Sequence, residues 1–195
     1  MMTIPNILTF SRIILTPFFI FSLFADFPYS KIWALVIFMV ASITDAYDGY
    51  YARKYNMVTA SGKFLDPLAD KILVSSAFIS FAVLGLIDYW MVGLIIFRDL
   101  FVTGLRITMS AKGFTMLTSN IAKAKTGTQI TIIITTLLFL GAKGFLEFSL
   151  LKEIIGLLIE YSVIYYLTGA VAVFTLYTGL TYVYENRKVI EKLFT

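Results

Sequence analysis

The sequence contains neither cysteine nor histidine among its 195 residues, and only 14% of the residues are charged. Without cysteine, the chain forms no disulfide, uses no thiolate nucleophile and binds no zinc through sulfur. Without histidine, it lacks the side chain that most often acts as a general base or as a metal ligand. A metal site in this chain must therefore be built from carboxylates.

Apolar side chains take the place of the missing charge. Hydrophobic residues make up 59% of the chain and aromatic residues 16%. This composition excludes an ordinary soluble domain and is typical of a polytopic membrane protein, so we expect one membrane domain over residues 1–195. We attribute the net charge of +4 to membrane topology and expect no nucleic-acid partner. The first six residues carry no basic region or cleavage site, so we expect no cleaved secretory signal.

Six apolar stretches are each long enough to cross a hydrocarbon core of about 30 Å as a helix. We therefore predict an all-α protein with six transmembrane helices. The expected spans are residues 7–25, 31–51, 62–86, 89–109, 126–142 and 161–184. Residues 143–160 are amphipathic and predict a helix along the membrane interface, with no assigned role.

Four aspartates lie where the second and third expected spans meet the same side of the membrane. Asp45 and Asp48 are three residues apart, and Asp66 and Asp70 are four apart. On helices, these spacings place each pair on one face. A charge at the bilayer centre costs about 2.5–3.5 kcal/mol on insertion scales, so four acids indicate a binding cavity rather than solvated helix ends. Two carboxylate pairs suit one hard divalent cation, or two.

The basic residues are distributed unequally between the two expected sides of the membrane. The aspartate side carries twelve of them, namely Arg12, Arg53, Lys54, Lys63, Lys71, Arg106, Lys112, Lys123, Lys125, Arg187, Lys188 and Lys192. The opposite side carries only Lys31, Lys143 and Lys152. This bias predicts a protein integral to the plasma membrane with its aspartates and both termini in the cytoplasm.

The aspartates belong to a longer pattern with eight fixed positions. It runs Asp45-x-x-Asp48-Gly49-x-x-Ala52-Arg53-x8-Gly62-x3-Asp66-x3-Asp70. Without a departure, this pattern resembles the signature of the CDP-alcohol phosphatidyltransferases. The resemblance implies that the four aspartates hold Mg²⁺ or Mn²⁺, as two ions, and that Asp70 is the catalytic base. It also implies that an alcohol attacks the lipid-bearing phosphorus of a CDP-linked lipid and that CMP leaves.

The same resemblance places the cytidine nucleotide of the donor lipid against small residues of this segment. Small residues in membrane helices also serve helix packing, and that alternative stays open. The residues assigned to the CDP-lipid are Gly49, Ala52, Arg53, Gly62, Asn6 and Thr9. For Asn6 and Thr9, capping of the first helix is the alternative. Arg12 is either an anchor that snorkels to the membrane surface or a phosphate contact.

Further stretches resemble the glycerol-phosphate branch of the family and extend the likeness over about two thirds of the chain. They are PNILTFSRI at the start, DPLADK, Arg98-Asp99, the TGLR that ends at Arg106, and AKAKTGTQ at 122–129. We expect Arg98 and Arg106 on the fourth span, with Lys123 and Lys125 in the loop after it, to hold the phosphate of sn-glycerol 3-phosphate. For the two lysines, the positive-inside bias is an alternative explanation.

These expectations describe an enzyme that transfers a phosphatidyl group from CDP-diacylglycerol to sn-glycerol 3-phosphate by direct displacement. The products are phosphatidylglycerophosphate and CMP. The resemblance also implies a homodimer surrounded by membrane lipids. Other branches of the family, which use serine, inositol phosphate or phosphatidylglycerol as acceptor, remain alternatives. An ion-coupled membrane transporter is the alternative from another class.

Overall fold

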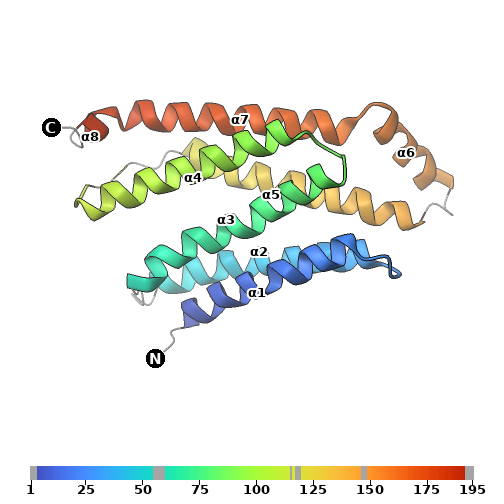
Figure 1. Cartoon of the computed structure of the whole chain (residues 1–195), viewed down its shortest axis with the longest axis horizontal. Coiled ribbons are helices and arrows are strands. Elements are labelled where there is room, and N and C mark those ends of the chain that lie inside the picture. Colours follow the sequence, from blue (N-terminus) through green and yellow to red (C-terminus); the bar gives the residue numbers. More distant parts are fainter. Residues whose placement is uncertain (1–3, 55–59, 115, 117–119, 146–148, 192–195) are drawn as a thin grey trace.

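The computed structural model describes residues 4–54, 60–114, 116, 120–145 and 149–191 (Figure 1). Its side chains are described over residues 10–44, 71–114, 116, 124–144 and 152–191. Every regular element within these ranges is helical, which confirms the all-α prediction. The elements are α1 (Ile4–Phe24), α2 (Ser30–Lys54), α3 (Ala60–Val83), α4 (Tyr89–Ala111), α5 (Asn120–Ala142), the 3₁₀ turn η1 (Lys143–Phe145), α6 (Ser149–Glu160), α7 (Val163–Glu185) and α8 (Arg187–Glu191).

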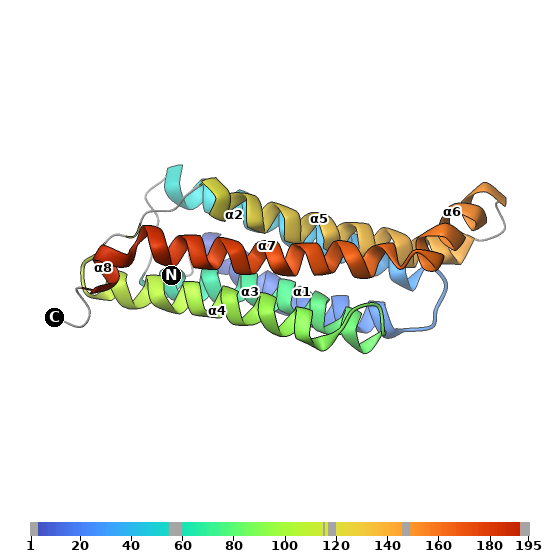
Figure 2. The same cartoon turned by 90° about the horizontal axis from the view of Figure 1, so that it is seen from above.

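The long helices lie side by side in one elongated bundle (Figures 1 and 2). α1 packs against α2 and α3, α2 packs against α5, and α3 packs against α4. α7 contacts both α4 and α5 and lies between them in Figure 2. The ends of α2, α4 and α7 and the starts of α1, α3 and α5 gather at one end of the bundle, which we call the α8 end (left in Figure 1). α6 lies at the opposite end.

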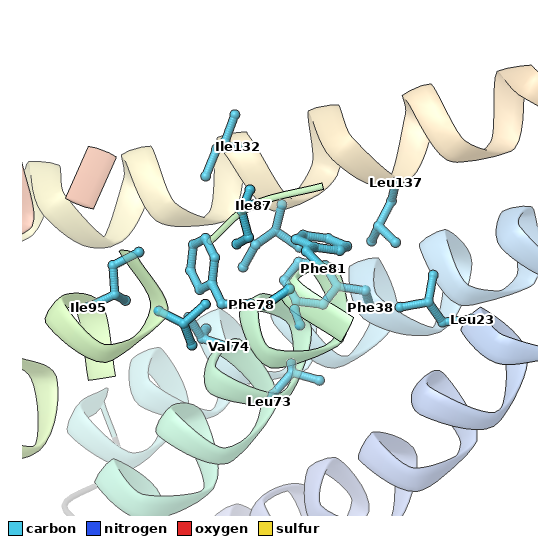
Figure 3. Packing of buried hydrophobic residues seen from close by; sticks show 14 of the residues in the cluster. Leu23, Phe38, Leu73, Val74, Phe78, Phe81, Ile87, Ile95, Ile132 and Leu137 are labelled. Atoms are coloured by element: carbon cyan, nitrogen blue, oxygen red, sulfur yellow. The ribbon is translucent and has the colours of Figure 1, made fainter. Parts of the chain in front are cut away.

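The centre of the bundle is an apolar core that fixes how these helices meet. Phe19 of α1 and Phe38 of α2 are both fully buried, and their ring centroids are 5.8 Å apart. Figure 3 shows Phe38 beside Phe78 and Phe81 of α3, with Leu137 of α5 above them. Burying a large apolar side chain contributes about 1.5–3 kcal/mol relative to exposing it, so this core holds the first five helices in register.

Two glycines end helices where the chain must turn. Gly85 follows α3 with φ of 71°, and Gly113 follows α4 with φ of 80°. After α4, the N–H of Phe114 bonds the carbonyl of Met109 at 3.0 Å, and the N–H of Gly113 bonds that of Ser110 at 3.0 Å. This pair of bonds is a Schellman motif, which glycine favours because it adopts positive φ without strain. The motif ends α4 sharply at the α8 end.

The helices have membrane lengths but not uniformly apolar compositions. α1 to α5 and α7 contain 21 to 25 residues each. Within the described ranges, the stretches that are both long and apolar enough to cross a membrane are Ala124–Ala142 and Val163–Glu185. Three shorter apolar helices are Phe10–Phe24, Ser30–Thr44 and Lys71–Val83. By this criterion the described residues supply two membrane-length spans rather than the six expected.

Two local predictions, the start of the fifth helix and the cap of the first, are wrong. The fifth helix begins at Asn120 instead of residue 126, so Lys123 and Lys125 lie on α5 and not in a loop. The reason is that the AKAK run consists of strong helix formers, although its charge suggested a loop. α1 already includes Ile4, so neither Asn6 nor Thr9 precedes this helix as a cap would. Pro5 is compatible with that early start, because a first helical turn needs no N–H from its residues.

Candidate active site

The residues of the eight-position pattern lie on the two helix segments that meet at the α8 end. Asp45, Asp48, Gly49, Ala52 and Arg53 are part of α2, and Gly62, Asp66 and Asp70 are part of α3. Their side chains, like those of Asn6, Thr9 and Lys123, fall outside the described side chains. The backbone therefore supports the predicted helical spacing of both aspartate pairs at one end of the bundle.

The four aspartates have the chemistry of metal ligands. Four carboxylates offer hard oxygen ligands, which are the ligands that Mg²⁺ and Mn²⁺ prefer. Among the side chains that the structure describes, no group of three or more acidic residues could hold a metal ion. The aspartates of α2 and α3 thus fit a divalent cation by ligand type and helical spacing.

A buried cluster of charged residues joins α4 to α5. Lys125 donates a hydrogen bond of 2.5 Å to Oδ2 of Asp99, and Nη1 of Arg98 lies 3.3 Å from Oδ1 of the same carboxylate. The exposed fractions of Arg98, Asp99 and Lys125 are 7%, 3% and 2%. We call these three residues the cationic cluster. Lys71 follows Asp70 on α3, and its positive charge repels that of Lys125. The cationic cluster therefore lies near α3, the helix that carries Asp66 and Asp70.

The cationic cluster is not electrically balanced. Among the described side chains, these two buried cations share one carboxylate, which leaves a surplus of one positive charge. Moreover, Nε and Nη2 of Arg98 are buried and have no hydrogen-bond partner among the described residues. A buried charge without a partner costs several kcal/mol, and buried donors are normally satisfied. An anion that accepted hydrogen bonds from Arg98 would neutralise the surplus charge and satisfy the two buried nitrogens.

Arg106 lies two turns beyond Arg98 on α4, closer to the α8 end. Its Nε is 3.4 Å from the hydroxyl of Tyr182 on α7, and its guanidinium carbon is 5.6 Å from the centroid of that ring. Tyr182 is fully buried and also donates a hydrogen bond to Sδ of Met116 at 3.6 Å. Tyr182 therefore restricts the orientation of the Arg106 guanidinium. Arg106 itself is exposed, so this group stays accessible to a ligand.

Two further polar contacts involve α7, one with α5 and one at its own C-terminal end. Nε2 of Gln129 donates to Oγ1 of Thr175 at 3.4 Å, and both side chains are buried. Asn186 donates to the carbonyl of Tyr182 at 2.9 Å and closes the end of α7. The contact between Gln129 and Thr175 joins α7 to α5, which carries Lys125 of the cationic cluster.

The structure thus brings together part of the predicted acceptor site. Arg98 and Lys125 meet through Asp99, whose role the sequence did not decide, and Arg106 lies toward the same end of α4. Arg12 is fully enclosed by protein, so the interpretation as a snorkelling anchor is wrong. Sequence reasoning missed Tyr182 and Thr175 because single polar residues on a membrane-length helix carry no motif. Gln129 ends the AKAKTGTQ stretch, but its contact with α7 could not be predicted from that stretch.

The chain is similar to a family of known proteins. The model of the CDP-alcohol phosphatidyltransferase family matches residues 2–181. A Bacillus subtilis (strain 168) protein named CDP-diacylglycerol–glycerol-3-phosphate 3-phosphatidyltransferase is 41% identical over 150 residues, covering 71% of this chain and 78% of its own. A Rickettsia bellii protein of the same name is 39% identical over 141 residues, covering 72% of this chain and 77% of its own. The chain belongs to the CDP-alcohol phosphatidyltransferase family.

Proposed function

We propose that this protein transfers the phosphatidyl group of CDP-diacylglycerol to sn-glycerol 3-phosphate, giving phosphatidylglycerophosphate and CMP. The observation that carries the proposal is the surplus positive charge of the cationic cluster at Arg98, Asp99 and Lys125. Among acceptor alcohols, one that carries a phosphate matches this charge and serine does not. Relatives at 37% to 41% identity bear the name of this activity.

On the donor side, Asp45, Asp48, Asp66 and Asp70 would hold two Mg²⁺ or Mn²⁺ ions. When bound, such ions neutralise the charge that develops on a diphosphate during phosphoryl transfer. The nucleotide of CDP-diacylglycerol would lie on the small residues of the same helices, with Arg53 beside its phosphates. The residues proposed to contact it are Gly49, Ala52, Arg53, Gly62, Asn6 and Thr9.

On the acceptor side, Arg98, Arg106, Lys123 and Lys125 would bind the phosphate of sn-glycerol 3-phosphate. Arg98 supports this role because two of its nitrogens are buried and lack partners among the described residues. Lys125 supports it indirectly, because it engages Asp99 and so prevents that carboxylate from fully neutralising Arg98. A dianionic phosphate would balance this surplus charge together with that of Arg106.

The chemical step is a single displacement at phosphorus. Asp70 would accept the proton of the acceptor hydroxyl, and that oxygen would form a bond to the phosphorus that carries diacylglycerol. The bond from this phosphorus to the oxygen of CMP would break, and its electron pair would leave with CMP. Asp70 follows Asp66 by one helical turn, so one face of α3 can serve both roles.

We further propose that α1 to α5 and α7 all cross the membrane, with the α8 end in the cytoplasm. The burial of Arg98 and Asp99 supports a crossing by α4, because both charges face protein and not lipid. The bias of twelve basic residues against three favours the cytoplasmic assignment. A homodimer within the plasma membrane completes the proposal.

The proposed function is tested with purified protein in detergent. CDP-diacylglycerol, sn-glycerol 3-phosphate and Mg²⁺ are supplied, CMP release is measured, and the lipid product is identified by mass spectrometry. We expect CMP and phosphatidylglycerophosphate in equal amounts, and no CMP release above background when the acceptor is omitted. Faster turnover with serine or inositol 1-phosphate would place the protein in another branch. Ion flux in proteoliposomes without CMP release would identify a transporter.

A further inference from the structure

α7 meets the basic residues of α4 at two positions, Gly179 and Tyr182. The two positions are three residues apart and therefore share a helical face. Gly179 faces Arg98, and Tyr182 faces Arg106. α7 lies in the last third of the chain, where the sequence predicted a membrane span but no site residue.

Gly179 provides space that no other residue would leave. A Cβ at this position would lie 2.8 Å from Cγ and 3.3 Å from Nε of Arg98. The first distance is an overlap of carbon atoms, and Cγ is close to the α4 backbone, so it can move away only by a change of rotamer. Gly169, ten residues earlier on α7, differs. A Cβ there would lie 3.5 Å from the flexible end of Met91, an ordinary contact.

Tyr182 restrains Arg106 by a second mechanism. Its ring is fully buried, so the hydroxyl that lies 3.4 Å from Nε of Arg106 has a fixed position. The same hydroxyl donates to Met116, and the backbone carbonyl of Tyr182 accepts a bond from Asn186. An exposed arginine otherwise samples many rotamers, and ordering it costs up to about 2 kcal/mol. Tyr182 supplies part of that ordering before a ligand arrives.

We propose that Gly179 and Tyr182 are positioning residues that hold the guanidinium groups of Arg98 and Arg106 in the geometry that binds the acceptor phosphate. This inference rests on the proposed function, because it concerns the affinity of that same site. It predicts that changes in α7 alter the KM for sn-glycerol 3-phosphate without a matching change in the KM for CDP-diacylglycerol.

The test compares Gly179→Ala with Gly169→Ala, two identical substitutions on one helix. Gly179→Ala should raise the KM for sn-glycerol 3-phosphate by about tenfold, as expected when a charge-assisted contact is lost. Gly169→Ala should leave both KM values within about twofold of the parent, because its new contact is an ordinary one. An unchanged acceptor KM in Gly179→Ala would overturn the role of Gly179.

A double-mutant cycle with Arg98→Ala separates positioning from a general disturbance of the helix. Without the Arg98 side chain, a Cβ at position 179 meets no obstacle there, so Gly179→Ala should have no further effect in this background. An equal effect in both backgrounds would show that Gly179 acts otherwise and would overturn the inference. If Arg98→Ala itself leaves the acceptor KM unchanged, the proposed acceptor site fails, and the inference fails with it.

Tyr182→Phe tests the second positioning residue. If Gly179→Ala does not fold, this variant still tests whether α7 positions the arginines of the acceptor site. The substitution keeps the ring and removes only the hydroxyl near Arg106. We expect the acceptor KM to rise about threefold with the donor KM unchanged, because the contact is long at 3.4 Å and Arg106 is exposed to water. No change in the acceptor KM, or an equal rise for both substrates, would overturn the role of Tyr182.

Discussion

Lys125 of α5 donates a 2.5 Å hydrogen bond to Asp99 of α4, and both side chains are almost completely buried. The other oxygen of Asp99 faces Arg98 at 3.3 Å, so one carboxylate serves two cations from two helices. In the proposed function, this relationship links helix packing to the binding of the acceptor phosphate. The carboxylate stabilises the cations enough to bury them and leaves one positive charge for an anion.

Asp99→Asn should destabilise the protein more than Lys125→Met does. The first change leaves Arg98 and Lys125 buried with no carboxylate between them, and the loss of one partner of a buried pair costs about 3–5 kcal/mol. The second change leaves Arg98 and Asp99 as a neutral pair. Thermal unfolding of both variants in the same detergent provides the measurement. Equal unfolding temperatures would show that the cationic cluster contributes no specific stability.

Arg106→Gln should weaken the binding of the acceptor and spare the donor. We expect the KM for sn-glycerol 3-phosphate to rise by about ten- to hundredfold, because a charge-assisted contact contributes about 1.5–3 kcal/mol. Arg187→Gln is the matched control, since Arg187 lies at the same end of the bundle but bonds to the carbonyl of Tyr184. Normal saturation of Arg106→Gln by sn-glycerol 3-phosphate would remove Arg106 from the acceptor site.

Activity should depend on Mg²⁺ or Mn²⁺ and be abolished by EDTA, because the clustered ligands are all carboxylates. Asp45→Asn, Asp48→Asn and Asp66→Asn should each lose most activity while the protein still inserts into membranes. Asp88→Asn is the control, since Asp88 bonds to Trp90 and Tyr165 near the start of α4, at the other end of the bundle. Full turnover in EDTA would exclude the two-ion site.

The role of Asp70 is tested by isotope exchange. If Asp70 is a base and not a nucleophile, labelled CMP should not enter CDP-diacylglycerol when the acceptor is absent. Asp70→Asn should abolish turnover and still bind CDP-diacylglycerol in an equilibrium assay. Rapid formation of labelled CDP-diacylglycerol would instead demonstrate a covalent phosphatidyl-enzyme, contrary to the direct displacement.

The sequence was sufficient to predict the helical fold and the family. Long apolar stretches with clear breaks between them, such as residues 25–29 between α1 and α2, indicate helices whatever their neighbours are. The eight positions from Asp45 to Asp70 lie in one short stretch of sequence, so the pattern can be recognised without a structure. The sequence pattern places the start of α5 too late, because the charge of Lys123 and Lys125 suggests a loop although alanine and lysine favour helix.

The partners of the buried charges could not be predicted. Asp99 is 26 residues from Lys125, and periodicity does not reveal which neighbouring helix a given face will meet. Gly179 is one of 12 glycines, and its importance arises only from the position of Arg98 on another helix. The surroundings of the α4 charges could not be predicted for a related reason. These charges count against a span in sequence, yet the fold buries two of them in protein.

The adjacency of Arg98 and Asp99 also affects how the protein is made. In the proposed six-span arrangement, α4 enters the bilayer during synthesis before α5 or α7 has left the ribosome. Neighbouring opposite charges enter as a nearly neutral pair, which lowers a cost of about 2.5–3.5 kcal/mol for each charge inserted alone. Lys125 arrives later, near the start of α5, and brings the excess positive charge with it. Under the proposed function, the chain therefore gains its affinity for the acceptor phosphate only after α4 and its two adjacent charges have been inserted.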